Sequence, residues 1–182
     1  NKKLFKFDIG TFKNNNFLFK KLKLNTNLDK VNRSLLKGFY GEKEEEFEII
    51  FDNEILNNKI TLNLNDISFY LDRELWKLKD SNSSITYNQN TKEFKLINFF
   101  LESKNQSINS DFRYKSTNDF DLKLITKDLK LHQFLSKNEK FDLSGFLSSE
   151  IIINQNEELQ SASANIITKN LVLNQNLIGD FD

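Results

Sequence analysis

The sequence predicts an all-β protein built as an elongated, twisted antiparallel sheet, with one or two short helical segments. Apolar and polar residues alternate with a period of two, as they do when one face of a sheet is buried and the other is wet. Polar clusters separate these runs about every ten residues, a spacing that fits a sandwich, a barrel or a solenoid. The 182 residues include no proline and five glycines. That composition disfavours the sharp corners of a small barrel and favours an elongated, repeating sheet.

The first third of the chain, residues 1–54, is predicted to be a β-rich segment with an irregular or helical insert. "LFKFDI" at 4–9 alternates and indicates a strand. "LDKVNRSLLKGFYGEKEEEFE" at 28–48 does not alternate, so we expect a helical or irregular segment there. The acidic run from Glu42 to Glu46 is most simply a solvated turn.

Residues 55–182 carry the clearer strand signals. Four turns are expected at "NQNTK", "SKNQ", "KSTND" and "NQNEE". The runs "FDLSGFLSSEIIIN" and "ASANIITKNLVLN" alternate less cleanly than the other predicted strands. The predicted strands are "KITLNLN", "SITYN", "SINSDFRYK", "DFDLKLIT", "FDLSGFLSSEIIIN" and "ASANIITKNLVLN".

One predicted strand changes its apolar parity part of the way along. "EFKLINFFLES" is apolar at Phe94 and Leu96, and then at Ile97, Phe99 and Leu101. A β-bulge would produce this switch, and so would a strand that is covered on both faces.

A second interruption predicts a short helix or turn. In "LKLHQFLSKNEKF" the apolar residues Leu129, Leu131, Phe134 and Leu135 have a spacing that suits one helical turn before the next strand. The chain starts without methionine and stops within an apparent strand, so we expect it to be part of a longer protein.

The composition excludes several classes of function. The 26 basic and 26 acidic residues are interspersed and cancel, which argues against a nucleic-acid or anionic-membrane surface held by bulk charge. The absence of cysteine excludes disulfides and thiol chemistry, and with one histidine it also excludes the usual zinc sites. No run of 18 or more apolar residues is present.

Few residues in the sequence suggest catalysis, so we expect no enzyme and no cofactor. His132 has no metal-ligating partners nearby in sequence and is interpreted as a surface or packed histidine. Asp119 and Asp121 could bind calcium from one strand face, but no glycine turn or further acidic ligands follow, so solvated charges are the simpler interpretation. Trp76 is expected to pack at a sheet rim, with a ligand contact as the alternative.

The stretch "LWKLKDSNSSITYNQNTKEFKLINFFLESKNQSINSDF" resembles the repeat of TamB-like translocation and assembly module proteins, especially those of Bacteroidetes. In that repeat a tryptophan opens a strand, and strands of the types "I-x-Y", "NFxL" and "Q-x-I" follow. The matching positions are Trp76, Ile85, Tyr87, Asn98, Phe99, Leu101, Gln106 and Ile108.

The second half of the chain extends the resemblance, which covers residues 55–182. "DLSGFL" is similar to the family's "L-S-G-x-L" unit, and "LVLNQNLIGD" is similar to its strand–turn–strand ending. Gln175 stands where a glycine is usual. The positions that carry these similarities are Leu143, Ser144, Gly145, Leu147, Leu171, Leu173, Asn174, Ile178, Gly179 and Asp180.

The resemblance implies a sheet curled into an open groove, the β-taco of AsmA-like and bridge-like lipid transfer proteins. Such proteins are anchored in the inner membrane, reach the outer membrane through the periplasm of Gram-negative bacteria, and take part in phospholipid transport and outer membrane biogenesis. An outer-membrane β-barrel of TamA or BamA type is the implied protein partner, and the anchor would lie outside this chain.

On this interpretation phospholipid acyl chains contact the apolar strand face. A closed β-core is the alternative for the same residues, and a register slip of one residue would reverse the facing. The residues expected to line the groove are Ile60, Leu62, Leu64, Ile85, Tyr87, Ile108, Phe112, Phe120, Leu122 and Leu124.

Three functions therefore remain open at the level of sequence. The first is a lipid conduit. The second is a scaffold that helps outer-membrane barrels to assemble by β-augmentation, in which free sheet edges pair with client strands. The third is a structural or adhesive surface repeat with a dry core.

Overall fold

The protein is a single antiparallel sheet, as seen in a computed structural model that describes residues 4–14, 17–27, 33–80, 82–134, 142–156 and 158–181. The all-β prediction is confirmed: these residues form 13 strands and one helix. The elements are β1 (Leu4–Asn14), β2 (Phe17–Asn27), β3 (Arg33–Tyr40), β4 (Glu45–Leu56), β5 (Lys59–Leu71), β6 (Glu74–Leu78), β7 (Ser84–Asn88), β8 (Glu93–Ser103), β9 (Gln106–Ser116), β10 (Asp119–Lys130), α1 (Leu131–Phe134), β11 (Leu143–Gln155), β12 (Gln160–Leu173) and β13 (Asn176–Phe181).

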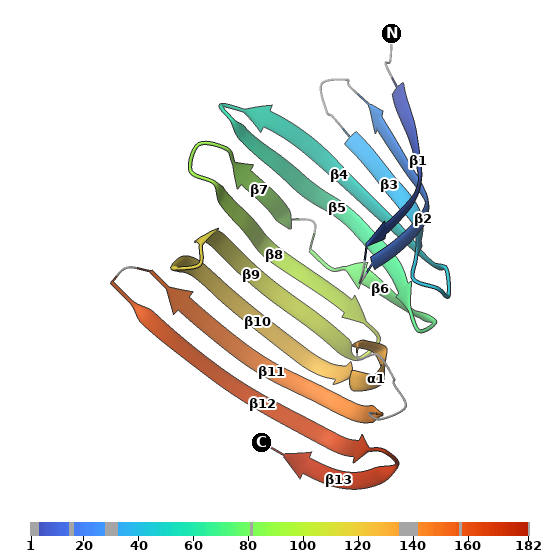
Figure 1. The fold of residues 1–182 in the computed structure, drawn as a ribbon, viewed down its shortest axis with the longest axis vertical. Coiled ribbons are helices and arrows are strands. Elements are labelled where there is room, and N and C mark those ends of the chain that lie inside the picture. Colours follow the sequence, from blue (N-terminus) through green and yellow to red (C-terminus); the bar gives the residue numbers. More distant parts are fainter. Residues whose placement is uncertain are drawn as a thin grey trace.

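The strands lie side by side in chain order, from β1 at the top right of Figure 1 to β13 at the bottom. The short strands β6 and β7 share one place in this order, because both pair with β5 on one side and with β8 on the other. In the described part of the chain, the main contacts between elements join ladder neighbours, and α1 adds contacts with β11. The sheet is therefore a single layer there.

The two faces of the sheet differ in chemistry, and the ladder register shows which residues share a face, because directly paired residues point to the same side. One face carries Leu64, Trp76 and Leu101; we call it the apolar face. The other carries Arg113 and Lys123 and is called the charged face.

The apolar face is concave at the N-terminal end of the sheet. The rings of Phe19 in β2 and Phe47 in β4 lie 5.7 Å apart, although β3 runs between these strands. Gly38 of β3 makes this possible: a Cβ there would lie 3.0 Å from the backbone oxygen of Lys20. A bulge at Lys21, with φ of 52°, bends β2 at the same level.

Regularly placed bulges bend the rest of the sheet. Asn98 in β8 has a φ of 54° and its N–H donates to Asp111 Oδ1 at 2.7 Å on the next strand. Asp128 in β10 and Asn170 in β12 repeat this arrangement, with φ of 47° and 50° and amides that donate to Ser148 and Asp180. Asn and Asp tolerate this left-handed conformation better than other residues do.

The parity switch in residues 93–103 is explained by the first of these bulges. The register shifts between Leu96 and Phe99, so Phe94, Leu96, Phe99 and Leu101 all lie on the apolar face, whereas Ile97 points to the charged face. The prediction of a bulge is confirmed. The predicted short helix is also confirmed as α1, while Leu135 lies outside the described residues.

The helical or irregular segment predicted at 28–48 is wrong where the structure describes it. Residues 33–40 form β3, 41–44 form a turn, and 45–56 form β4. Leu35 and Leu36 obscured the alternation, because adjacent apolar residues face opposite sides of β3, which pairs with β2 and β4. Residues 28–32 lie outside the described part. The exposed residues Glu42 and Glu44 confirm the solvated turn.

The buried core is small and lies at one end of the apolar face. Its members are Leu64, Ile67, Trp76, Leu101 and Leu129, which are exposed by 9% or less. Leu101 and Leu129 lie near the C-terminal ends of β8 and β10, and Trp76 packs edge-on against Phe134 of α1. The opposite half of the apolar face therefore keeps its large side chains accessible.

Candidate functional site

An unbroken row of apolar side chains crosses the open half of the apolar face. Each member is paired directly with the next along the sheet, from β5 through β7, β8, β9, β10 and β11 to β12. None of these residues is buried. We call this the central row, and it consists of Leu62, Ile85, Leu96, Phe112, Leu122, Ile153 and Ala162.

The row nearest the strand ends away from α1 is more amphipathic. It contains two tyrosines, and it ends in two glutamines on β11 and β12. Tyr114 is 39% exposed. We call it the rim row, and its directly paired members are Ile60, Tyr87, Phe94, Tyr114, Phe120, Gln155 and Gln160.

Towards α1 the face remains largely apolar for one more row, and the fourth row then mixes apolar and polar residues. Phe99, Ser110, Leu124, Ile151 and Ala164 form the third row. The next row brings together Thr126 and Ser149, whose hydroxyl oxygens lie 2.9 Å apart. Rows are about 7 Å apart, since strands rise about 3.3 Å per residue. Leu101, Ile108 and Ile166 share this fourth row, so the apolar character of the face continues into the core. We call the rim, central and third rows together the open band.

The residues predicted to line a groove all lie on the apolar face. Ile60, Tyr87 and Phe120 belong to the rim row, while Leu62, Ile85, Phe112 and Leu122 belong to the central row. Leu124 lies in the third row and Ile108 in the fourth. Leu64 shares their face but is only 3% exposed, so it belongs to the core and not to the accessible surface.

Several members of the open band were missed from sequence, among them Phe94, Leu96, Ile151 and Ile153. Phe94 and Leu96 precede the bulge at Asn98, and the mixed parity of their strand hid their facing. Ile151 and Ile153 flank Ile152, so this run is apolar on both faces of the sheet and its sequence does not show which face is which. The signal that could have found these four is pairing: each lies directly opposite a predicted lining residue, as Ile153 does opposite Leu122.

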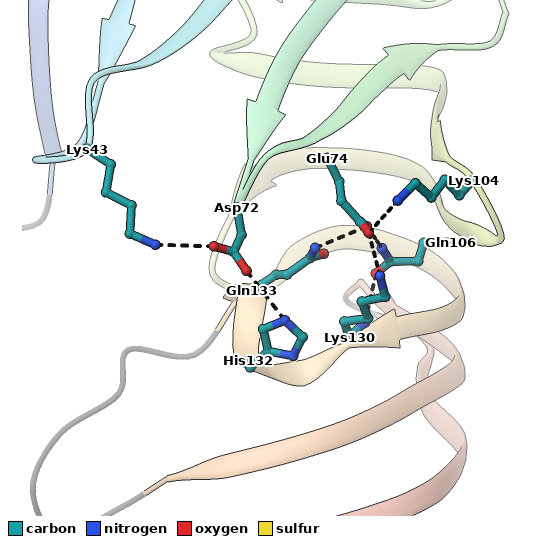
Figure 2. A network of polar contacts seen from close by, with 8 residues as sticks. All are labelled: Lys43, Asp72, Glu74, Lys104, Gln106, Lys130, His132 and Gln133. Carbon is teal, nitrogen blue, oxygen red and sulfur yellow. Dashed lines mark hydrogen bonds and ion pairs between the residues drawn. The ribbon is translucent and has the colours of Figure 1, made fainter.

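The other end of the apolar face is closed by α1 and a cluster of polar residues, which together we call the capped end. Figure 2 shows Glu74 of β6 at its centre, with side chains from the β8–β9 turn, β9, β10 and α1 pointing towards its carboxylate. Its partners are Lys104 at 3.0 Å, Gln106 at 2.7 Å, Gln133 at 3.1 Å and Lys130.

The electrostatics of the capped end follow from this geometry. The Glu74 side chain is only 11% exposed, and its hydrogen bonds to Lys130 and Lys104 lower the pKa of its carboxyl to about 2. Gln106 accepts from the backbone N–H of Lys130 at 2.8 Å, which fixes its amide for donation to Glu74. The carboxylate thus joins β6, β9, β10 and α1.

Trp76 is fully buried and packs against α1. Its ring stacks on Phe69 at 6.3 Å and meets the edge of Phe134 at 5.7 Å. Among the described residues its Nε1 has no hydrogen-bond partner. α1 therefore covers the core with one aromatic ring and with Leu131, which is 8% exposed.

Residues with potential for chemistry serve as ion-pair partners. His132 Nε2 lies 3.5 Å from Asp72 Oδ2, and Lys43 approaches the other oxygen of that carboxylate at 3.2 Å (Figure 2). Asp119 and Asp121 both contact Arg113 at 2.6 Å, and Arg113 lowers the pKa of Asp119. Within the described ranges, no three His, Cys, Asp or Glu residues are grouped as metal ligands would be.

The described part of the chain contains no helix long and apolar enough to span a membrane. The open band is a continuous surface of mostly half-buried apolar side chains across β5 and β7–β12, whereas the most exposed apolar side chains, such as Leu56 and Leu177, lie outside it. Contacts to such a surface are non-directional, so it can hold an apolar chain without fixing its position.

Comparisons with protein-family models, with curated proteins and with solved structures give no match for this chain.

Proposed function

We propose that this chain is a periplasmic segment of a TamB-like protein of a Gram-negative bacterium, and that its open band shields phospholipid acyl chains on their way between the inner and outer membranes. In this proposal the inner-membrane anchor lies outside the chain, and an outer-membrane β-barrel of TamA or BamA type receives the far end. The segment is not an enzyme and needs no cofactor.

The observation that carries the proposal is the unbroken central row on a single-layer sheet. A row of aliphatic and aromatic side chains crosses from β5 to β12, and none of them is buried. Transfer of a methylene from water to such a surface gains about 0.8 kcal/mol, so even partial shielding of an acyl chain lowers the cost of crossing water. The uniform lining would let the chain slide without a deep trap.

The sequence resemblance supports the same reading from a separate direction. It covers residues 55–182, which include the strands of the central row. The motif positions Ile85 and Phe99 lie in the open band, as expected for residues whose side chains line a groove, whereas Leu101 belongs to the core.

The test is to measure bound lipid in matched variants. Ala164 and Ser163 are adjacent and both exposed on β12, but Ala164 faces the apolar side and Ser163 the charged side. Ala164→Asp should lower the phospholipid that co-purifies with the chain roughly tenfold, because it places a carboxylate in the band. Ser163→Asp should leave bound lipid unchanged.

Leu122→Asp in the middle of the central row should abolish lipid binding, as counted by mass spectrometry of extracted lipid. Equal lipid content in the wild type, Ala164→Asp and Leu122→Asp proteins, all folded by circular dichroism, would reject the proposal.

A second candidate function is suggested by the two edge strands of the described sheet. Among the described strands, β1 and β13 each have a ladder partner on one side only. Either could accept a strand from a barrel protein by β-augmentation, which would make the chain an assembly scaffold. Under that function the Leu122→Asp variant would still bind the barrel, while disruption of β13 would abolish binding.

A further inference from the structure

The open band has a direction, because its two borders differ in chemistry. At the rim row, Tyr87 and Tyr114 flank Phe94, and tyrosine combines an apolar ring with a hydroxyl that prefers water. At the other border Leu101, Thr126 and Ser149 of the fourth row are buried, the two hydroxyls bond to each other, and the core around Trp76 follows. The first border is accessible, and the second is closed by α1.

From this gradient we infer that a phospholipid lies along the strands, with its ester and head group at the Tyr87–Tyr114 rim and its methyl ends directed towards Trp76. This inference rests on the proposed function, and it adds the orientation of the lipid. A chain that lay along the row direction instead would place both of its ends against equivalent apolar side chains and leave the amphipathic rim unused.

The size of the band fits an acyl chain in this orientation. From Tyr114 to Ile108 on β9, six residues span about 20 Å at 3.3 Å per residue. One leaflet of a bilayer has a hydrocarbon depth of about 15 Å, half of the 30 Å core. A chain that starts at the rim therefore ends close to the core, and the closed border stops it there.

The electrostatics of the two borders agree with this orientation. The cationic groups of the capped end are already engaged, since Lys104 and Lys130 both pair with Glu74. That end therefore offers a phosphate little charge that is not already paired. In the residues that the structure describes, the rim has no such cluster, and Tyr114 there is 39% exposed.

The test uses Trp76, the one tryptophan of the chain, as a native reporter near the closed border. The chain is loaded from vesicles of phosphatidylethanolamine and phosphatidylglycerol that contain phosphatidylcholine with a nitroxide either near the carbonyl or near the terminal methyl of one acyl chain. The expected result is a greater loss of Trp76 fluorescence with the methyl-end label.

A relocated reporter provides the control. The Trp76→Phe, Tyr114→Trp double variant moves the indole to the rim, and there the carbonyl-end label should quench more strongly. A greater loss with the carbonyl-end label in the unmodified chain overturns the inference, and so does an equal loss with both labels.

Lipid bound to the isolated chain is counted in parallel by mass spectrometry. If lipid is bound but the quenching order is wrong, the orientation alone is rejected and the proposed function stands. If no lipid is bound, both are rejected.

Discussion

Glu74 carries most of the polar organisation of the apolar face. It accepts hydrogen bonds from side chains of the β8–β9 turn, β9, β10 and α1, and it is 11% exposed. Ion pairs on open surfaces contribute little, whereas removal of one partner from a buried, hydrogen-bonded cluster leaves the others unpaired. The position of α1 over Trp76 therefore depends on this single carboxylate.

We predict that Glu74→Gln lowers the free energy of unfolding at neutral pH by about 2 kcal/mol, because hydrogen bonds to a charged acceptor are lost. The folded-state pKa is depressed from 4.5 to about 2. The carboxylate thus contributes stability above pH 4.5 that is lost as the pH falls towards 2. Urea titrations at several pH values should show this loss in the wild type and its reduction in Glu74→Gln.

Glu102 supplies the matched control for this prediction. It pairs with Lys79 at 2.7 Å on the charged face, but its side chain is 43% exposed. Glu102→Gln should change stability by less than about 0.5 kcal/mol. Equal effects of the two substitutions would show that the Glu74 cluster does not hold the capped end together.

The sequence correctly predicted which residues share a face of the sheet, but it did not predict which of them are buried. Ile60, Leu62 and Leu122 were expected on one face and lie there, because alternation within a strand is visible in the sequence. Leu64 has the same parity as Leu62, yet it is buried and Leu62 is not. The difference comes from the core around Trp76 and α1, which brings together residues that are distant in sequence.

At the scale of the strand, bulges set the curvature of this sheet. Those in β8, β10 and β12 each place one residue at positive φ and cap its amide with a side chain on the following strand. A bulge increases the local bend and twist of a strand. Repetition on alternate strands therefore curls the sheet progressively.

A substitution at Gly145 in β11 tests whether a residue at positive φ is required for the stability of the sheet. Its φ is 124°, and a Cβ there would lie 2.8 Å from the backbone oxygen of Asn170. Gly145→Ala should lower the free energy of unfolding by about 3 kcal/mol, because both backbone strain and a clash with β12 result.

Gly179 separates these two contributions. Its φ of 117° is similar, but nothing lies within 4 Å of the position of a Cβ. Gly179→Ala should therefore cost only the strain, about 1 kcal/mol. Urea unfolding would measure the free energy of unfolding of both variants. A larger loss of stability in Gly179→Ala than in Gly145→Ala would contradict the close approach of β11 and β12.

The strands themselves were predictable where a bulge or a turn interrupts a clear alternation. The parity switch at Ile97 indicated a bulge without the need for any long-range information. At Leu35 and Leu36 the same information was insufficient, because β3 presents apolar residues on both faces and its pairing with β2 and β4 overrides local spacing. The alternation of apolar residues can be read from the sequence of one strand, but the strands with which it pairs cannot.

At the scale of the whole molecule, the sheet is one layer with a small core. The sequence could not distinguish this from a closed β-core, since the same amphipathic strands build both. The ladder order β1 to β13 and the few buried apolar residues indicate the open arrangement for the described part of the chain. A protein of this kind leaves much of its possible hydrophobic stabilisation unused in water.

We therefore predict that a lipid-like ligand stabilises the whole chain. A short-chain phosphatidylcholine, kept below its critical micelle concentration, should raise the free energy of unfolding by about 2.7 kcal/mol when its concentration is 100 times its dissociation constant. Urea midpoints with and without the lipid measure this effect. The Ala164→Asp variant should show a much smaller increase, and an equal increase in both proteins would place the ligand elsewhere.

Because the strands pair in the order of the sequence, the sheet can be lengthened by adding strands at its edges. In the described part of the chain the main-chain ladder joins each strand only to its neighbours in the sheet order, so a pair of strands can be added without changing the pairing of the others. Each added pair of strands lengthens the sheet, measured across its strands, by about 10 Å, which is twice the usual spacing of neighbouring strands. The extent of such a sheet across its strands can therefore change in steps of one hairpin.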